Sequence, residues 1–277
     1  MTQMKQPVTG FVETNGTKLY YEMMGEGHPL VLIHGGYMDR RMWDDQFAVF
    51  AQHYRVIRYD VRGFGKTGLP AVPYTDRQDL FNLLAFLGVD ATYIVALSLG
   101  GEIAIDFTLD YPDRVEALVL VGASVSGMPV MDLITQEQLQ QHIKLWTPFE
   151  EAKARRDLAG MVEGVMSHPT LVPSANYASA RQRVRENLSE YSFVWVLEPG
   201  QKQATVPAAW GRLSDIVAPT LIVVGGDDDK LLHTVADKLE QDIPNVKRVV
   251  IAETHHMPNM EKPEEFNRIV LDFLKTV

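Results

Sequence analysis

Cysteine is absent from this chain of 277 residues. Without thiols the protein can form no disulfide, use no cysteine nucleophile, and hold no iron–sulfur cluster or zinc site built on cysteine ligands. The absence leaves its redox compartment undetermined. His255, His256 and the acidic run at 227–229 are possible metal ligands, but no His-x-x-x-His helix accompanies them. We therefore expect no metal site.

Positive charge is also scarce, since 26 Lys and Arg face 36 Asp and Glu, for a formal net charge of -10. Such a charge repels the phosphates of nucleic acid and an anionic membrane surface, so we expect neither as a partner. No apolar run approaches the roughly 20 residues that span a bilayer. Residues 1–10 lack the apolar stretch of a secretory signal. We expect a cytoplasmic protein that acts on a small molecule, and the sequence leaves its oligomeric state open.

Short apolar runs alternate with segments of helical period along most of the chain. The first two runs flank Asn15-Gly16, a dipeptide that favours a tight hairpin turn. Strands that alternate with helices of about 10 to 15 residues indicate a mostly parallel sheet with helices on both faces, so the predicted fold class is α/β. The expected strands are 11–14, 17–23, 29–33, 54–59, 92–97, 115–121, 220–224 and 247–251, and the expected helices are 42–52, 75–87, 99–110, 231–241 and 263–275.

The alternation stops between about Ser124 and Leu213, where no strand run of this kind occurs. We interpret residues 124–213 as a helical lid inserted into one core domain, which consists of residues 1–123 and 214–277. The aromatic residues of the insertion suit a cap over a pocket, and equally a core of the insertion's own. These aromatics are Trp146, Phe149, Tyr177, Tyr191, Phe193, Trp195 and Trp210.

A serine stands directly between a predicted strand and a predicted helix. Ser98 would occupy a sharp turn at the carboxyl edge of the sheet, with its hydroxyl exposed and a helix N-terminus behind it. The strained backbone needs small residues two positions before and two positions after the serine. Gly100 meets this need fully, and Ala96, where glycine is usual, meets it less well. The alternative is an ordinary serine that caps the helix.

A serine hydroxyl is a poor nucleophile at neutral pH, and it needs a base together with a group that orients the base. The order expected in this type of fold is serine, then acid, then histidine. The triplet Asp227–Asp229 follows one strand run, and His255 and His256 follow the last one. Only one aspartate can hold the imidazole, and we favour Asp228. The residues alone leave the choice between the two histidines open.

Residues 63–68 match the G-x-G-x-x-G pattern of dinucleotide-binding turns. Such a turn must open a helix whose N-terminus receives the pyrophosphate. Here Pro70 and Pro73 follow at once, and two prolines disfavour a helix. We therefore interpret the string as a structural turn in which Asp60 and Arg62 hold the loop beside the site.

Five strings together resemble the α/β-hydrolase superfamily over nearly the whole chain, and particularly its esterase, enol-lactonase and cofactor-free perhydrolase-like branch. The resemblance implies Ser98 as the nucleophile, Asp228 as the acid and His256 as the base, and it implies no cofactor. Ala96 and His255 depart from the pattern, because the family more often has glycine at both positions. The five strings are residues 32–36 with Trp43 beyond, 59–67, 96–101, 219–228 and 256–263.

The resemblance also implies an oxyanion hole made by the backbone N–H groups of Gly36 and Leu99. Acyl transfer develops negative charge on the carbonyl oxygen, and two fixed donors stabilise that charge without reorganising.

The expected function is hydrolysis of a carboxylic ester through an acyl-enzyme. The alternatives are an enol-lactone or carbon–carbon bond hydrolase of aromatic degradation that uses the same triad, and a non-catalytic ligand receptor on the same fold. Arg181, Arg183 and Arg185 would meet an acidic substrate if they faced inward, but three alternating cations are more typical of a solvated helix face.

Overall fold

The computed structural model describes residues 6–198 and 200–277. A central sheet has eight strands in the order β1-β2-β4-β3-β6-β7-β9-β10. β1 and β2 form an antiparallel hairpin at one edge, and the pairing is parallel from β4 onward. The predicted α/β class is thus confirmed. The strands are β1 (Val8–Thr14), β2 (Thr17–Met24), β3 (Pro29–Ile33), β4 (Arg55–Tyr59), β6 (Thr92–Leu97), β7 (Val115–Val121), β9 (Thr220–Gly225) and β10 (Val246–Ile251).

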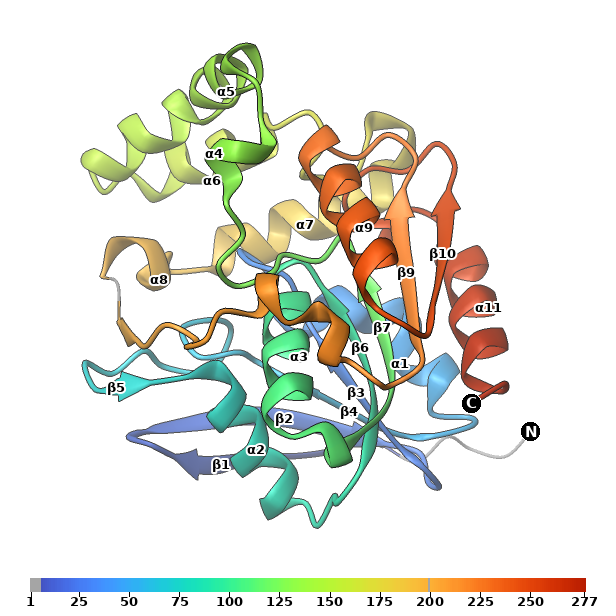
Figure 1. The fold of residues 1–277 in the computed structure, drawn as a ribbon. Helices are drawn as coiled ribbons and strands as arrows, with labels where there is room; N and C mark the ends of the chain where they lie inside the picture. The colour runs from blue at the N-terminus through green and yellow to red at the C-terminus, as the bar shows by residue number, and fades with distance from the viewer. Residues whose placement is uncertain (1–5, 199) are drawn as a thin grey trace.

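Helices cover both faces of this sheet (Figure 1). Thr75 accepts the N–H of Gln78 and thereby caps the helix that follows it. Among the described residues, no helix combines the length and the apolar character needed to cross a membrane. The covering helices are α1 (Asp44–Phe50) and α11 (Pro263–Leu274) on one face, and α2 (Asp76–Phe86), α3 (Leu99–Asp110) and α9 (Lys230–Asp242) on the other.

The predicted strands and helices are all present, with small differences at their ends. Apart from the helices of the insertion and the short 3₁₀ turns, three elements of the described chain were not predicted, one helix and two strands. The one-turn helix α10 (Pro258–Glu261) precedes α11, and β8 (Gln201–Lys202) pairs in parallel with β5 (Pro73–Tyr74). Because β8 consists of two exposed residues that pair through backbone groups, no hydrophobic alternation marks it in the sequence.

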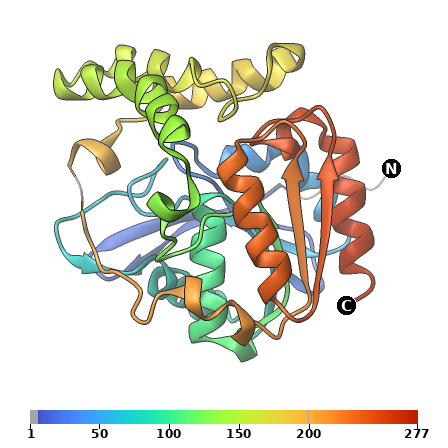
Figure 2. The same ribbon diagram turned by 45° about the horizontal axis from the view of Figure 1, so that its top comes forward.

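The insertion after β7 forms a layer of helices that crosses above the carboxyl edge of the sheet (Figure 2). We call residues 124–198 the cap; residues 201–213, which the sequence analysis includes in the same insertion, run beside β5 and α3 (Figure 1). Within the cap α5 packs on α6, and α6 packs on α7. The helices of the cap are α4 (Val130–Leu133), α5 (Gln136–Ala154), α6 (Leu158–Met166), α7 (Ala178–Glu190) and α8 (Val194–Leu197).

Several cap aromatics pack around a side chain of the core domain. Tyr37 belongs to the loop after β3, and its ring centroid lies 6.1 Å from Trp146, 5.7 Å from Phe149 and 6.3 Å from Phe193. Phe149 and Phe193 are themselves buried. These aromatics therefore form a core that the cap shares with the loop beneath it. Burial raises the pKa of Tyr37 to about 12, so its hydroxyl stays neutral.

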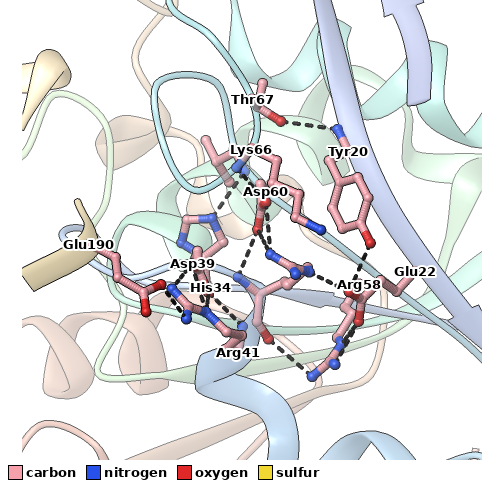
Figure 3. A network of polar contacts seen from close by, with 12 residues as sticks. Tyr20, Glu22, His34, Asp39, Arg41, Arg58, Asp60, Lys66, Thr67 and Glu190 are labelled. Atoms are coloured by element: carbon pink, nitrogen blue, oxygen red, sulfur yellow. Dashed lines mark hydrogen bonds and ion pairs between the residues drawn. The ribbon is translucent and has the colours of Figure 1, made fainter. Parts of the chain in front are cut away.

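Buried charges hold the glycine-rich turn at residues 63–68 (Figure 3). Asp60 is fully buried; it accepts the N–H of Lys66 at 2.8 Å and pairs with the Arg40 guanidinium at 3.0 Å. Arg62 is fully buried as well and pairs with Asp79 at 2.7 Å. The chain after the turn enters β5 and forms no helix. Asp60 and Arg62 thus anchor a structural turn.

Gly65→Ala is expected to destabilise the protein more than Gly88→Ala. Both glycines have positive φ, +51° and +64°, so both substitutions bear the strain of a left-handed backbone. A Cβ at Gly65 would lie 2.3 Å from the Asp60 carboxylate, whereas open space surrounds Gly88. Urea denaturation should show a loss of about 3 kcal/mol for Gly65→Ala and about 1 kcal/mol for Gly88→Ala. Equal losses would contradict the role given to Asp60.

Candidate active site

Ser98 occupies a strained turn between β6 and α3. Its backbone has φ 54° and ψ -113°, a conformation that residues with a side chain rarely adopt and that costs about 1–3 kcal/mol. Three backbone hydrogen bonds hold the turn: the Ser98 N–H donates to Val121 at 2.9 Å, and its carbonyl accepts from Glu102 and Ser124, each at 3.1 Å. Within the described chain, the Ser98 side chain makes no bond that caps α3. The hydroxyl is therefore not used as an ordinary helix cap.

Close packing explains the small residues around this serine. A Cβ at Gly100 would lie 2.4 Å from the Ile33 carbonyl oxygen, so only glycine fits there without a shift of the backbone. Ala96 is fully buried in β6, between Ile33 of β3 and Leu120 of β7. Its methyl group is accommodated, and the departure from glycine at this position leaves the turn intact.

Asp228 and His256 meet at the carboxyl edge of the sheet. His256 Nδ1 and Asp228 Oδ2 are 3.0 Å apart, and both side chains are almost completely buried. The other oxygen of Asp228 accepts the N–H of Asp229 at 2.7 Å. The carboxylate is thereby fixed in orientation, and it holds the imidazole with Nε2 left for another partner.

The electrostatics of this pair determine how His256 titrates. Burial lowers the pKa of His256, but the Asp228 carboxylate opposes that effect, and the pKa lies above the ordinary value of 6.5. The imidazolium is stabilised because its positive charge faces a buried carboxylate. His256 is thus a stronger base than a free imidazole.

Neighbouring residues that also carry suitable chemistry serve other purposes. Asp227 is exposed, and Asp229 caps α9 by accepting the N–H of Leu231 at 2.8 Å. Nδ1 of His255 lies 3.2 Å from the carbonyl oxygen of Val172 in the cap. The structure therefore pairs one aspartate of the triplet, Asp228, with one histidine, His256.

His34 orients the loop that follows β3. Its side chain is fully buried, with Nδ1 2.8 Å from the Gly35 carbonyl and Nε2 3.0 Å from the N–H of Val61. Because Val61 donates to Nε2, the proton resides on Nδ1 and the ring is neutral. Burial also lowers the pKa of His34. Figure 3 shows His34 close to Asp60, so the same loop is joined to the charged network described above.

The loop after β3 begins against Ser98. A Cβ at Gly35 would be 3.5 Å from the Ser98 Cβ, which places the start of the loop against the serine. Gly36 follows in that loop, and Leu99 begins α3. In residues 6–198 and 200–277 neither Gly36 N–H nor Leu99 N–H donates to a backbone carbonyl. Both groups therefore remain for an acceptor from outside.

The turn after β7 lies between the serine and the imidazole. Ser124 donates to the Ser98 carbonyl, and a Cβ at Gly122 would lie 2.9 Å from two atoms of the His256 ring. Across the described residues there is no hydrogen bond between the Ser98 hydroxyl and His256. Such bonds are often long before substrate binds and tighten in the reacting complex.

The cap contacts the candidate site through its backbone. The N–H of His256 donates to the Thr170 carbonyl at 3.0 Å. No sequence pattern marks Thr170, because the group that binds is a carbonyl oxygen, which every residue carries. His34 was part of a predicted string, but its bond to Val61 could be found only from the fold.

The three cap arginines are bound by protein groups. Each guanidinium has an acceptor within the protein; the Arg185 pair with Glu163 lies on an exposed face, as the sequence predicts, whereas Arg181 and Arg183 are partly buried. Arg181 donates to Met166 and Pro173 carbonyls at 2.6 and 2.8 Å, Arg183 binds Asp45 of α1 at 2.5 Å, and Arg185 binds Glu163.

The described part of the chain contains no cluster of side chains suited to bind a metal ion. There, no group of three or more His, Asp and Glu residues is placed to hold a metal ion. His255 and His256 have the separate partners given above.

Comparisons with known proteins agree with this fold. A family model described as alpha/beta hydrolase fold matches residues 28–263. A 2-hydroxy-6-oxononadienedioate/2-hydroxy-6-oxononatrienedioate hydrolase from Burkholderia vietnamiensis is 31% identical over 280 residues, which cover 95% of this chain and 94% of the relative. A pimeloyl-[acyl-carrier protein] methyl ester esterase from Nitrosospira multiformis is 28% identical and covers 93% of this chain and 98% of its own.

A solved structure also matches over nearly the whole length. The enol-lactonase from Burkholderia xenovorans LB400 has a TM-score of 0.79 and 23% identity, and the match covers 96% of this chain and 100% of that one. That likeness concerns the fold. With the family model matching most of the chain and the sheet order described above, the protein belongs to the alpha/beta hydrolase fold family and is a hydrolase.

Proposed function

We propose that the protein hydrolyses carboxylic esters through an acyl-enzyme on Ser98. His256 takes the proton of the Ser98 hydroxyl as the oxygen attacks the acyl carbon, and the alcohol leaves with that proton. Water then attacks the acyl-enzyme with the same base, which releases the acid and restores the serine. The observation that carries the proposal is the 3.0 Å bond between buried Asp228 and His256 beside the strained Ser98 turn.

Gly36 and Leu99 complete this proposal as the oxyanion hole. Leu99 follows Ser98 directly, and Gly36 follows Gly35, which packs against Ser98. Neither Gly36 N–H nor Leu99 N–H donates to a backbone carbonyl in the described residues. Negative charge on the tetrahedral intermediate would be stabilised by these fixed donors, and loss of one such donor typically costs about 3–4 kcal/mol in the transition state.

The cap favours a substrate without charge. Substrates that carry carboxylates need cations that are free to receive them. Arg181, Arg183 and Arg185 are already bound by protein acceptors. An uncharged ester therefore fits the cap better than a dianion, and a relative that is 28% identical is named as a methyl ester esterase.

A second candidate is hydrolysis of a carbon–carbon bond in a ring-cleavage product. The relative that is 31% identical is named as a hydrolase of a 2-hydroxy-6-oxo dienedioate, and hydrolysis beside such a 6-oxo group breaks a carbon–carbon bond. The same serine, base and acid would serve, because this reaction also passes through attack on a carbonyl carbon.

Ser98→Ala should lower kcat/KM on a nitrophenyl ester by about 10⁴-fold or more, because the nucleophile is removed. A fluorophosphonate should label the natural protein once per chain and leave Ser98→Ala unlabelled. Ser214→Ala is the matched control, since Ser214 is exposed and lies in the loop before β9; it should behave as the natural protein. Full activity in Ser98→Ala would refute the proposed nucleophile.

Asp228→Asn should change both the rate and its pH dependence. Because neutral His256 is the active form, kcat/KM falls as the pH drops through the pKa of this histidine, which lies above 6.5. Loss of the Asp228 charge should move this acid limb to lower pH and reduce kcat by about 10⁴-fold.

Asp227→Asn provides the comparison for this pH experiment, because Asp227 is exposed in the same loop. Rates measured from pH 5 to 9 should match those of the natural protein. An acid limb that stays in place in Asp228→Asn would show that another group controls the base.

A paired substrate screen should separate the two candidate reactions. We expect kcat/KM for uncharged nitrophenyl esters of short acids to exceed that for 2-hydroxy-6-oxo dienedioates by about 100-fold, because Arg181, Arg183 and Arg185 already bind protein acceptors. The opposite ranking, measured by absorbance under the same conditions, would establish the second candidate.

A further inference from the structure

Glu261 is a buried carboxylate that the proposed mechanism does not use. It lies at the end of α10, directly after the loop that carries His256, and it is 5% exposed. One of its oxygens accepts the N–H of His255 at 2.6 Å. The other accepts the N–H of Ser174 at 2.9 Å. A single side chain thus binds the residue next to the proposed base and a residue of the cap.

Further contacts join the same two segments. The N–H of His256 donates to Thr170 at 3.0 Å, and the Tyr177 hydroxyl donates to the Glu253 carbonyl at 3.0 Å. Residues 170–177 of the cap therefore lie along residues 253–256, and the backbone at both histidines is held by hydrogen bonds. The position of the imidazole depends on these bonds, since its only other anchor described above is Asp228.

A buried carboxylate such as that of Glu261 destabilises the fold unless hydrogen-bond donors compensate for its loss of water. Burial raises the pKa of Glu261, and the N–H groups of Ser174 and His255 act in the opposite direction. Within the described residues Glu261 has no salt bridge, so two backbone donors are what satisfy the charge. If the segment 170–177 moved away, the carboxylate would lose the donor from Ser174 and the loop would lose its contact with the cap.

We propose that Glu261 is a positioning residue that couples the cap to the catalytic base. With the cap segment in place, the carboxylate and the Thr170 carbonyl together fix the backbone of His255 and His256, and the imidazole is aligned on Asp228. When the cap segment lifts, the bond from Ser174 to Glu261 and the bond from His256 to Thr170 are lost together, and the base is misaligned. The inference rests on the proposed function of Ser98 and His256.

Glu261→Gln tests this coupling, because the two N–H groups bind different oxygens of Glu261, and in glutamine one of them would face the NH₂ group, which is a donor. We expect kcat to fall about tenfold with a smaller change in KM. The acid limb of kcat/KM should also move to lower pH, since a negative charge near His256 is removed. The other groups that act on His256 are Asp228, Asp229 and, from the cap, His168.

Glu253→Gln is the matched control. Glu253 lies in the same loop, but its side chain is exposed and binds Lys262 at 3.1 Å. The variant should keep the natural kcat and pH profile. Rates are to be expressed per competent site, titrated with a fluorophosphonate, so that a loss of folded protein is not counted as a loss of turnover. A Glu261→Gln protein that matches Glu253→Gln in kcat and pH profile would overturn the proposal.

Ser174→Pro isolates the bond to the cap. Ser174 has φ -64° and ψ 164°, which suit a proline backbone; the change removes the N–H that Glu261 accepts, puts a ring carbon in its place, and removes a hydroxyl for which no hydrogen bond is seen in the described residues. The expected result is a fall in kcat of about fivefold or more with the acid limb unmoved, because the charge of Glu261 remains.

An unchanged kcat per site in Ser174→Pro would overturn the coupling, and this result decides the matter even if Glu261→Gln does not fold. The outcome for the proposed function is separate. Activity that persists in Ser98→Ala would end that proposal, whereas normal dependence on Ser98 with unaltered Glu261→Gln and Ser174→Pro proteins would overturn this inference alone.

Discussion

The strained backbone at Ser98 is the constraint on which the site depends. A residue with a side chain at φ 54° is held there only because its surroundings leave no alternative. Hydrogen bonds to Val121 and Ser124 fix the turn from the side of β7, and the close approach of Gly100 to Ile33 fixes it from β3. The hydroxyl is therefore presented at the sheet edge by the packing of three neighbouring strands, and not by a flexible loop.

The polar groups around this turn are hydrogen-bonded in pairs, and these bonds fix the geometry of the site. Asp228 holds His256 on one side, and the bond between His34 and Val61 holds the loop after β3 on the other. Asp60 anchors the next loop through Arg40. In a medium of low polarity such satisfied networks allow few alternative arrangements, because any displaced charge would be left without a partner.

Much of this arrangement could be predicted from the sequence, for reasons that differ between elements. The strands and helices of the core carry strong hydrophobic patterns. The chemistry requires a serine, an acid and a histidine, and the fold type sets the order in which Ser98, Asp228 and His256 occur. The choice between His255 and His256, by contrast, needed the family resemblance.

Other contacts could not be predicted, because they depend on groups without sequence specificity or on long-range packing. Thr170 acts through its carbonyl, β8 pairs through backbone groups, and Arg183 reaches Asp45 across the fold. Alternating arginines on α7 indicate a helix face, but only the fold determines what that face meets. The hydrogen bonds between the cap and the core belong to this group, because they use backbone carbonyls or side chains far apart in the sequence.

The packing of Tyr37 limits how the cap could be exchanged between related proteins. Its backbone follows directly on Gly36, while its ring is enclosed by Trp146, Phe149 and Phe193. A cap transplanted from a relative would bring a different set of rings and would alter the peptide that precedes Tyr37. The cap and this loop therefore pack as one unit, and a chimera that exchanges the cap alone would lose the fit between Tyr37 and the rings around it.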